Sequence, residues 1–326
     1  MRSRRFAFGS DLELVIRASG RDLRHFEAEY GPGRESSSAD ADVVVTLRRG
    51  GTATRRYKTV HWGLAVDARD RRLRAELALG GRPRSFGLSL VQGYFVEPLL
   101  SLVAPAAGYV LLPAAGFSVR GQTVVLMGRS RVGKSSVAAQ MLAGGHAFLG
   151  DDQILIDAAG RATRFPRRLR LYSDLAVTAP DAYRSLGRSA KAGLLLRQVV
   201  KHGTRGYVAP PVRVLADELG PNAGVPSAHL PIDTVIHVVR GSGDVVRDGP
   251  ITADAAVGLA VELLRLQRTT LLETVPALAA HAAEGTEAER EILRSAFAST
   301  RTEELRLPSS LTAPAAIALL GRRLGI

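Results

Sequence analysis

One short segment combines glycines, a lysine and serines at a spacing that suits the binding of a polyphosphate. It follows the pattern Gly-x-x-x-x-Gly-Lys-Ser, after an apolar run expected to form a strand (123–127) and at the start of an expected helix (134–142). Its residues are Gly128, Arg129, Ser130, Arg131, Val132, Gly133, Lys134 and Ser135, followed by Ser136. The two glycines allow a tight turn that directs main-chain N–H groups at phosphate oxygens, beside the positive end of the helix. The segment therefore predicts a Walker A loop (P-loop) for a nucleoside triphosphate.

Three side chains of this loop have separate expected roles. Lys134 would bridge the β- and γ-phosphates as a point charge, and Ser135 would offer its hydroxyl to Mg²⁺. Arg131 stands where many such loops have glycine. Its long cation would reach a γ-phosphate or an anionic substrate, or else point into solvent. We therefore expect ATP and Mg²⁺ as cofactors.

Two adjacent carboxylates follow the loop at a sequence separation that fits a strand–helix–strand unit. Asp151 and Asp152 lie 17 and 18 residues after Lys134, enough for one helix and a short returning strand. A right-handed strand–helix–strand crossover would bring that strand's carboxyl end beside the loop. One carboxylate would then help hold the metal, and its neighbour would accept a proton from an attacking hydroxyl. A solvated Gly-Asp-Asp turn is the alternative reading.

These features together resemble a known family. The segment 124–156, with its Gly-Lys-Ser-Ser loop, Gly145-His146 and Gly150-Asp151-Asp152, is similar to the catalytic domain of HPr kinase/phosphorylase. It is more similar to divergent HPr-kinase-like proteins, some of which phosphorylate serine in peptide natural products such as lasso-peptide precursors. Looser similarities extend the resemblance over about 95–240, at Glu97–Leu100, Phe165–Leu171 and Leu230–Asp233. The resemblance implies catalytic roles for Lys134, Asp151 and Asp152, with Asp152 as proton acceptor and Asp151 and Ser135 on the metal side.

The chain departs from that family in two places. Pro113 occupies the position of a family histidine, and the family's Glu-Ile-Arg-Gly-Leu-Gly signature, whose glutamate binds metal, is absent. The first difference puts the reverse, phosphorylase reaction in question. The second leaves a second metal ligand unassigned, with Asp174 and Glu218 as candidates.

The chain is expected to contain two domains of α/β character. Residues 1–105 are expected to form a small α+β module that could recognise substrate, and 106–326 a P-loop kinase-like catalytic domain with C-terminal helices. Apolar alternation predicts strands at 42–47, 59–66 and 73–79 and a helix at 88–102 in the first module. In the second, strands are expected at 109–112, 123–127, 146–149 and 234–239, a hairpin at 153–160, and helices at 134–142, 253–266 and 287–297.

Composition narrows the remaining classes of function. The formal charge is +13, but the arginines are scattered and no nucleic-acid motif accompanies them, which disfavours nucleic acid as partner. Cysteine is absent, so disulfides and thiolate metal sites are excluded. The basic N-terminus lacks the apolar core of a secretory signal, and the apolar stretch 95–117 is interrupted by prolines and Glu97. We expect a cytoplasmic protein without a membrane span; the oligomeric state is open, a homo-oligomer included.

Two basic segments are further candidates for contacts with substrate. The arginines Arg167, Arg168 and Arg170 could hold a phosphate or an anionic substrate, or lie on a solvated face. The stretch 201–206 could be a mobile substrate loop.

The leading hypothesis is an ATP-dependent kinase that transfers the γ-phosphoryl group to a hydroxyl, either serine of a peptide or protein or a small-molecule alcohol. The rivals are a regulatory P-loop ATPase and a nucleotide-binding protein with reduced catalysis. A GTPase is disfavoured because the chain lacks an Asn-Lys-x-Asp motif, and a transporter ATPase because it lacks Leu-Ser-Gly-Gly-Gln. Chemistry like that of phosphoenolpyruvate carboxykinase would need a second metal site that the sequence does not supply.

Overall fold

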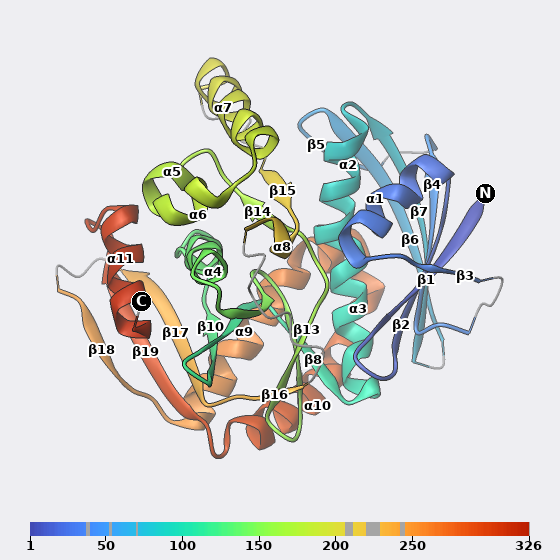
Figure 1. Cartoon of the computed structure of the whole chain (residues 1–326). Helices are drawn as coiled ribbons and strands as arrows, with labels where there is room; N and C mark the ends of the chain where they lie inside the picture. Colours follow the sequence, from blue (N-terminus) through green and yellow to red (C-terminus); the bar gives the residue numbers. More distant parts are fainter. Residues whose placement is uncertain are drawn as a thin grey trace. The chain divides into compact units, whose positions relative to one another are not determined.

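The computed structural model describes residues 1–36, 40–51, 54–69, 71–205, 211–219, 229–241 and 245–325. Mixed sheets and helices make the chain an α/β protein, as expected (Figure 1). It divides into two compact units. The first contains Met1–Leu111 and Val261–Ile292, and the second contains Leu112–Ala260 and Leu293–Ile326.

The first unit is built on a seven-stranded mixed sheet. Its order is β3-β1-β2-β4-β7-β6-β5, with β2, β4 and β7 parallel to one another and the other neighbours antiparallel. The strands are β1 (Arg2–Phe8), β2 (Leu12–Ala18), β3 (Arg34–Glu35), β4 (Val43–Arg49), β5 (Arg55–Tyr57), β6 (Val60–Arg69) and β7 (Arg72–Gly81). The three strands expected in this module are therefore present, and β1, β2, β3 and β5 were not anticipated.

The helix α1 (Gly20–Tyr30) begins at a capping serine. Ser19 accepts a hydrogen bond from the main-chain N–H of Asp22, which satisfies one of the free donors of the first turn. The Asp22 carboxylate is buried and receives two hydrogen bonds from Arg84, at 3.1 and 2.9 Å. Burial raises the pKa of Asp22, but the hydrogen bonds and charge of Arg84 outweigh it and hold that pKa below its ordinary value.

A long apolar helix follows β7. It consists of α2 (Arg84–Val91), a π-helical turn (Gln92–Val96), α3 (Glu97–Val103) and a 3₁₀ turn (Ala104–Ala107). It has the length and apolar composition of a membrane span, but 78% of its apolar window is buried inside the protein, as in a core helix. No other helix in the described part of the chain is both that long and that apolar.

The π-helical turn faces a buried polar cluster. The Gln92 side-chain amide donates to the Glu97 carboxylate at 2.8 Å, and the Tyr30 hydroxyl donates to the same oxygen at 3.4 Å. The imidazole of His25 contacts the Gln92 amide oxygen at 3.0 Å. Glu97, one of the residues in the looser part of the family resemblance, therefore lies in the interior of the first unit.

Two C-terminal helices contribute to the first unit. They are α9 (Ala253–Thr274) and α10 (Ala279–Phe297), and their residues between 261 and 292 belong to that unit. Arg268 of α9 is 3% exposed and contacts the buried Glu289 of α10, while its guanidinium donates at 2.8 Å to both the hydroxyl and the carbonyl of Ser101. The sequence placed everything after residue 105 in the second domain, whereas these residues belong to the first compact unit.

The second unit is built on a six-stranded sheet of order β11-β9-β10-β17-β19-β18. Its strands are β9 (Ala114–Val119), β10 (Gln122–Met127), β11 (Ala147–Gly150), β17 (Thr234–Gly241), β18 (Arg247–Pro250) and β19 (Arg301–Pro308). The central strands β10, β17 and β19 are parallel. Because β9 is antiparallel to both β10 and β11, those two strands run in the same direction. Their carboxyl ends therefore lie at one edge of the sheet, about 10 Å apart at the usual spacing of two strand steps.

The second unit also contains two smaller sheets and several helices. A second sheet contains β12 (Ile154–Asp157), β13 (Arg161–Arg164) and β16 (Leu230–Pro231), and β14 (Leu169–Leu171) pairs with β15 (Val212–Val214). The chain passes between the units within β8 (Tyr109–Leu112). The helices are α4 (Lys134–Ala143), α5 (Leu175–Thr178), α6 (Pro180–Ser185), α7 (Arg188–Gly203), α8 (Ala216–Leu219) and α11 (Ala313–Leu324). The expected strands, the hairpin and the helix after the loop are confirmed, whereas β9 was not anticipated.

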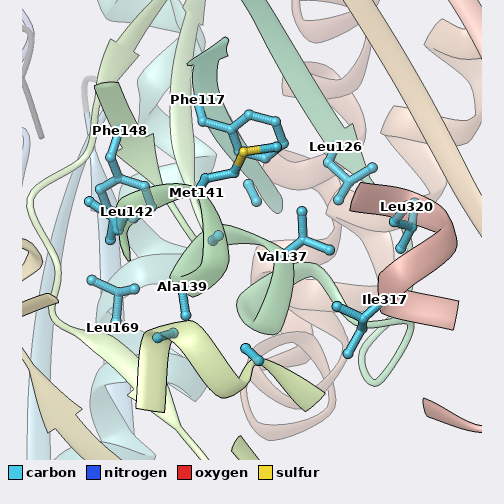
Figure 2. Packing of buried hydrophobic residues seen from close by; sticks show 14 of the residues in the cluster. Phe117, Leu126, Val137, Ala139, Met141, Leu142, Phe148, Leu169, Ile317 and Leu320 are labelled. Atoms are coloured by element: carbon cyan, nitrogen blue, oxygen red, sulfur yellow. The ribbon is translucent and has the colours of Figure 1, made fainter. Parts of the chain in front are cut away.

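One core cluster fixes α4 on the sheet. Figure 2 shows side chains of α4 packed among residues of the sheet and of α11. The buried residues in this view include Phe117, Leu126, Val137, Met141, Ile317 and Leu320. Because α4 begins directly after the glycine-rich loop, this packing fixes the position of the loop's last residues.

An ion-paired carboxylate on β19 contacts the neighbouring strand β17, and its contribution to stability can be tested. Glu304 lies opposite His237 of β17, and its carboxylate contacts the His237 ring at 3.3 Å and the Arg306 guanidinium at 2.5 Å. Burial raises the pKa of Glu304, but the hydrogen bonds from Arg306 and His237 outweigh it and lower that pKa. A carboxyl with a lowered folded pKa stabilises the native state above its unfolded pKa of about 4.3, and this stability is lost as pH falls through the folded value.

We therefore expect Glu304→Gln to lower the free energy of unfolding by about 1 kcal/mol at neutral pH. The difference from wild type should disappear in acid, below the lowered pKa. Urea unfolding at both pH values measures it, with Glu291→Gln, at an exposed position of α10, as control. A difference that persists unchanged in acid would contradict the ion-pair origin.

Candidate functional site

The glycine-rich loop lies at the carboxyl edge of the parallel strands. β10 ends at Met127 and α4 begins at Lys134, so the loop connects a central strand to a helix N-terminus. Gly128 has φ of 155°, and a Cβ there would come within 2.5 Å of the Val238 carbonyl oxygen of the neighbouring strand. Gly133 has φ of 109° and forms the N-cap of α4. Both positions therefore require glycine, for the physical reasons that the motif implies.

The lysine side chain is enclosed by the loop. Lys134 is 8% exposed, and its ammonium donates to the carbonyls of Gly128 at 2.6 Å and Arg129 at 3.0 Å. Burial lowers the pKa of this ammonium, although the charges of Asp152 and Asp151 act in the opposite direction. The loop thus holds a cation in a partly desolvated position.

The other loop residues differ in exposure. Arg129, Ser130 and Arg131 are exposed, whereas Val132 is buried. Arg131 has φ of 71°, in the left-handed region that disfavours a side chain, which explains why glycine suits this position.

The serines after the loop lysine lie in the first turn of α4. Ser135 is half-buried, and the Ser136 hydroxyl donates to the Thr178 hydroxyl at 3.4 Å. Thr178 in turn donates to the main-chain oxygen of Asp174 at 3.1 Å. The Ser136 hydroxyl therefore contacts α5. Ser136 belongs to the site through its main chain in the first turn of α4.

The two acids follow β11 directly and have different surroundings. A Cβ at Gly150 would come within 2.3 Å of the Gln153 carbonyl oxygen, so the turn that presents the acids requires glycine. Asp151 is 2% exposed and accepts a hydrogen bond from the main-chain N–H of Arg170 at 3.3 Å. The Asp152 side chain is 40% exposed and forms ion pairs with Arg167 at 2.9 Å and Arg170 at 3.7 Å.

Three separate segments meet around these carboxylates. Residues Arg167 and Arg170, which the sequence offered as contacts for phosphate or substrate, lie beside Asp152. The ammonium of Lys134 is close enough for both carboxylates to influence its pKa. The structure therefore brings together the loop lysine, the acid pair and two of the three arginines.

Tyr172 also lies at this place and was not selected from the sequence. It follows β14 and is 46% exposed. Partial burial raises the pKa of its hydroxyl, the charges of Asp152 and Asp151 raise it further, and Arg167 and Arg131 act to lower it. A lone tyrosine after a three-residue strand carries no pattern, so only tertiary structure could reveal this neighbour.

Glu218 and Asp174, the candidates for a second metal ligand, have other contacts in the structure. The Glu218 carboxylate accepts a hydrogen bond from the main-chain N–H of Leu215 at 3.0 Å, and Asp174 is the N-cap residue of α5. Within the described part of the chain, no group of three or more histidine or acidic side chains is arranged to hold a metal. Neither residue therefore joins the acid pair in such a group. Lys201, His202 and Gly203 are the end of α7 and not a loop, and Gly206 lies outside the described residues.

Comparison with protein-family models finds no match for this sequence, and comparison with curated proteins finds no significant match.

Proposed function

We propose that the second unit is a P-loop catalytic domain of the HPr-kinase type, and that the chain is an ATP-dependent kinase acting on a hydroxyl group. The acceptor would be serine in a peptide or protein, or a small-molecule alcohol. The observation that carries the proposal is geometric: the glycine-rich loop after β10 encloses Lys134, and Asp151 and Asp152 follow β11, which runs in the same direction as β10.

The residues of the loop fit a Mg²⁺-bound triphosphate. The ammonium of Lys134 donates to two loop carbonyls, and phosphate oxygens are stronger acceptors for the same donor. The main-chain N–H groups of Ser136 and Val137 bond to the Gly133 carbonyl. No described residue accepts from those of Lys134 and Ser135, which are left for an anion at the helix N-terminus.

Each residue would have a distinct task. Mg²⁺ would neutralise phosphate charge, held by the Ser135 hydroxyl and the buried Asp151 carboxylate, since Mg²⁺ takes one or two carboxylates together with substrate phosphates. Lys134 would bind the β- and γ-phosphates. The more exposed Asp152 would orient the acceptor hydroxyl and receive its proton, and its ion pair with Arg167 would have to loosen for this step.

That ion pair also favours the two rival functions. If Asp152 serves only to neutralise Arg167 and Arg170, it is not a base, and the site would act as a regulatory ATPase or as a nucleotide-binding protein with reduced catalysis.

Incubation with γ-labelled ATP, Mg²⁺ and the products of neighbouring genes separates these functions. A kinase transfers the label to one of these products. A regulatory ATPase releases labelled phosphate alone, and a catalytically reduced protein retains intact nucleotide. The proposal is refuted by Mg²⁺-dependent release of phosphate with no labelled acceptor across this set.

The lowered pKa of Lys134 gives a second test. The side chain attracts phosphate only when it is protonated, and burial lowers its pKa in the free protein. Affinity for MgATP is therefore expected to decline as pH rises through that lowered value, before the ordinary lysine pKa of about 10.4 is reached. Titration calorimetry over a pH series measures the decline, and Lys134→Ala should bind weakly at every pH. Constant wild-type affinity up to the ordinary lysine pKa would contradict the role of this ammonium.

A further inference from the structure

A cationic pocket lies in the first unit, at the hairpin of β5 and β6. It has a volume of about 320 Å³ and is lined by Thr54, Arg55, Arg56, Thr59 and His61. Each of these side chains can donate a hydrogen bond, and none is acidic. The proposed phosphoryl transfer uses none of them.

The two arginines keep their positive charge available. The guanidinium of Arg55 donates to the main-chain carbonyl of Glu273 at 2.9 Å, and that of Arg56 to the main-chain carbonyl of Lys58 at 2.9 Å. Both residues are exposed, and within the described part of the chain neither forms an ion pair with a carboxylate. Carbonyl contacts orient the guanidinium groups without neutralising them, so the pocket carries a net positive charge.

Two glycines shape the wall of the pocket. A Cβ at Gly80 would lie 2.0 Å from the Nε2 atom of His61, which faces it across the strand pair. Gly81 has φ of 95°, and a Cβ there would lie 2.1 Å from the Thr59 carbonyl oxygen. The end of β7 therefore leaves the space in which His61 and Thr59 line the pocket.

Aromatic contacts hold the hairpin in place. The ring of Tyr57 packs against Phe86 at 6.4 Å and Tyr94 at 6.5 Å between centroids. The ammonium of Lys58 lies 5.2 Å from the Tyr57 centroid and adds a third cation at the turn. The pocket is thus part of an anchored hairpin, which reduces the entropic cost of ordering it on binding.

The position of β5 in the sheet indicates the shape of the ligand. β5 is the last strand of the sheet, so one of its edges pairs with β6 and the other has no strand partner among the described residues. Unpaired main-chain groups at such an edge can bond to an extended peptide, while arginine forks bind carboxylates. An acidic peptide uses both features, whereas a free phosphate uses only the second.

We propose that this pocket binds an acidic segment of a polypeptide, through carboxylates held by Arg55, Arg56 and His61. The assignment deepens the proposed kinase function, on which it rests, because the segment would belong to the polypeptide that carries the acceptor hydroxyl. The charges that hold the acceptor would belong to the first unit, and the residues that act on its hydroxyl to the second.

The test is the binding of a fluorescein-labelled, glutamate-rich peptide to the full chain, measured by fluorescence anisotropy without nucleotide. A peptide with glutamine at the same positions should not bind. Arg55→Glu combined with Arg56→Glu should raise the dissociation constant at least about tenfold, because attraction becomes repulsion at two sites. Arg71→Glu, at an exposed position in the turn between β6 and β7, is the matched control and should bind as wild type does.

Several outcomes would overturn the proposal. Two concern the variants: equal peptide affinity in the double variant and wild type, or an equal loss of peptide affinity in the Arg71→Glu control. Two concern the ligand: displacement of the peptide by low concentrations of inorganic phosphate, or binding of single-stranded DNA that is tighter than that of the peptide and depends on the arginines. If the charge-reversed protein has a lowered melting temperature, peptide binding is measured on Arg55→Gln with Arg56→Gln, which removes the two charges without reversing them. MgATP affinity is measured separately on the same proteins. Absence of MgATP binding would refute the kinase assignment, and the peptide result could still be interpreted.

Discussion

Asp152→Asn is expected to reduce phosphoryl transfer by about 10²- to 10⁴-fold, the usual contribution of a positioned general base. The amide keeps the shape of the side chain but cannot accept the proton of the acceptor hydroxyl. Affinity for MgATP should be retained, because Lys134 and the main-chain groups of the loop are untouched. Transfer is measured with γ-labelled ATP, and binding is measured separately by calorimetry.

The ion pair with Arg167 makes a structural role the main competing explanation. The Arg167 side chain is 4% exposed, so removal of its counter-ion would lower the melting temperature if Asp152 acted mainly as that counter-ion. A matched control is Asp157→Asn in the same unit. Asp157 pairs with Arg161 at 2.7 Å and caps the turn at Ala159, so this change should lower stability and leave transfer unaltered in the folded protein. Wild-type transfer by Asp152→Asn would refute the assignment of the base.

Glu289→Leu is expected to lower the free energy of unfolding of the first unit by about 3–5 kcal/mol, the cost of leaving a buried charge unpaired. Arg268 and Glu289 are 3% and 1% exposed, and Arg268 also holds both the hydroxyl and the carbonyl of Ser101. The change would leave the guanidinium buried without its carboxylate. Glu287→Leu, at an exposed position on the same helix, should cost little.

The double variant Arg268→Met with Glu289→Leu distinguishes charge from packing. Replacing both members of a buried ion pair by apolar residues of similar size is often neutral, so this variant should recover most of the stability. Urea unfolding of the wild type, of Arg268→Met and Glu289→Leu alone and of the double variant measures the coupling between the two residues. If the losses of unfolding free energy in the two single variants add up in the double variant, the pair does not interact. That result would contradict the role of this ion pair in joining α9 to α10.

The sequence predicted best those features whose cause is local. Gly128 and Gly133 are required by the backbone geometry of the loop itself, and the apolar strand before it and the helix after it follow from short-range patterns. Gly150 and the acids after it were likewise placed correctly at the end of a strand.

The features that the sequence missed depend on distant partners. β9 has the composition Ala-Ala-Gly-Phe-Ser-Val, with little strand propensity, and it forms because β10 and β11 pair with its two edges. The place of 261–292 in the first unit depends on buried contacts such as those of Arg268. The pairing of Arg167 with Asp152 and the position of Tyr172 likewise arise only when separate segments meet.

The central claim is that the acid pair faces the phosphates held by the loop, and a crystal structure with Mg²⁺ and a non-hydrolysable ATP analogue tests it most directly. We expect the γ-phosphate beside Lys134, the Ser135 hydroxyl about 2.1 Å from Mg²⁺, and Asp151 bound to the metal directly or through one of its waters. The Asp152 carboxylate should face the γ-phosphate. An analogue bound elsewhere, or bound in the loop with both carboxylates directed away from metal and phosphate, would contradict the account.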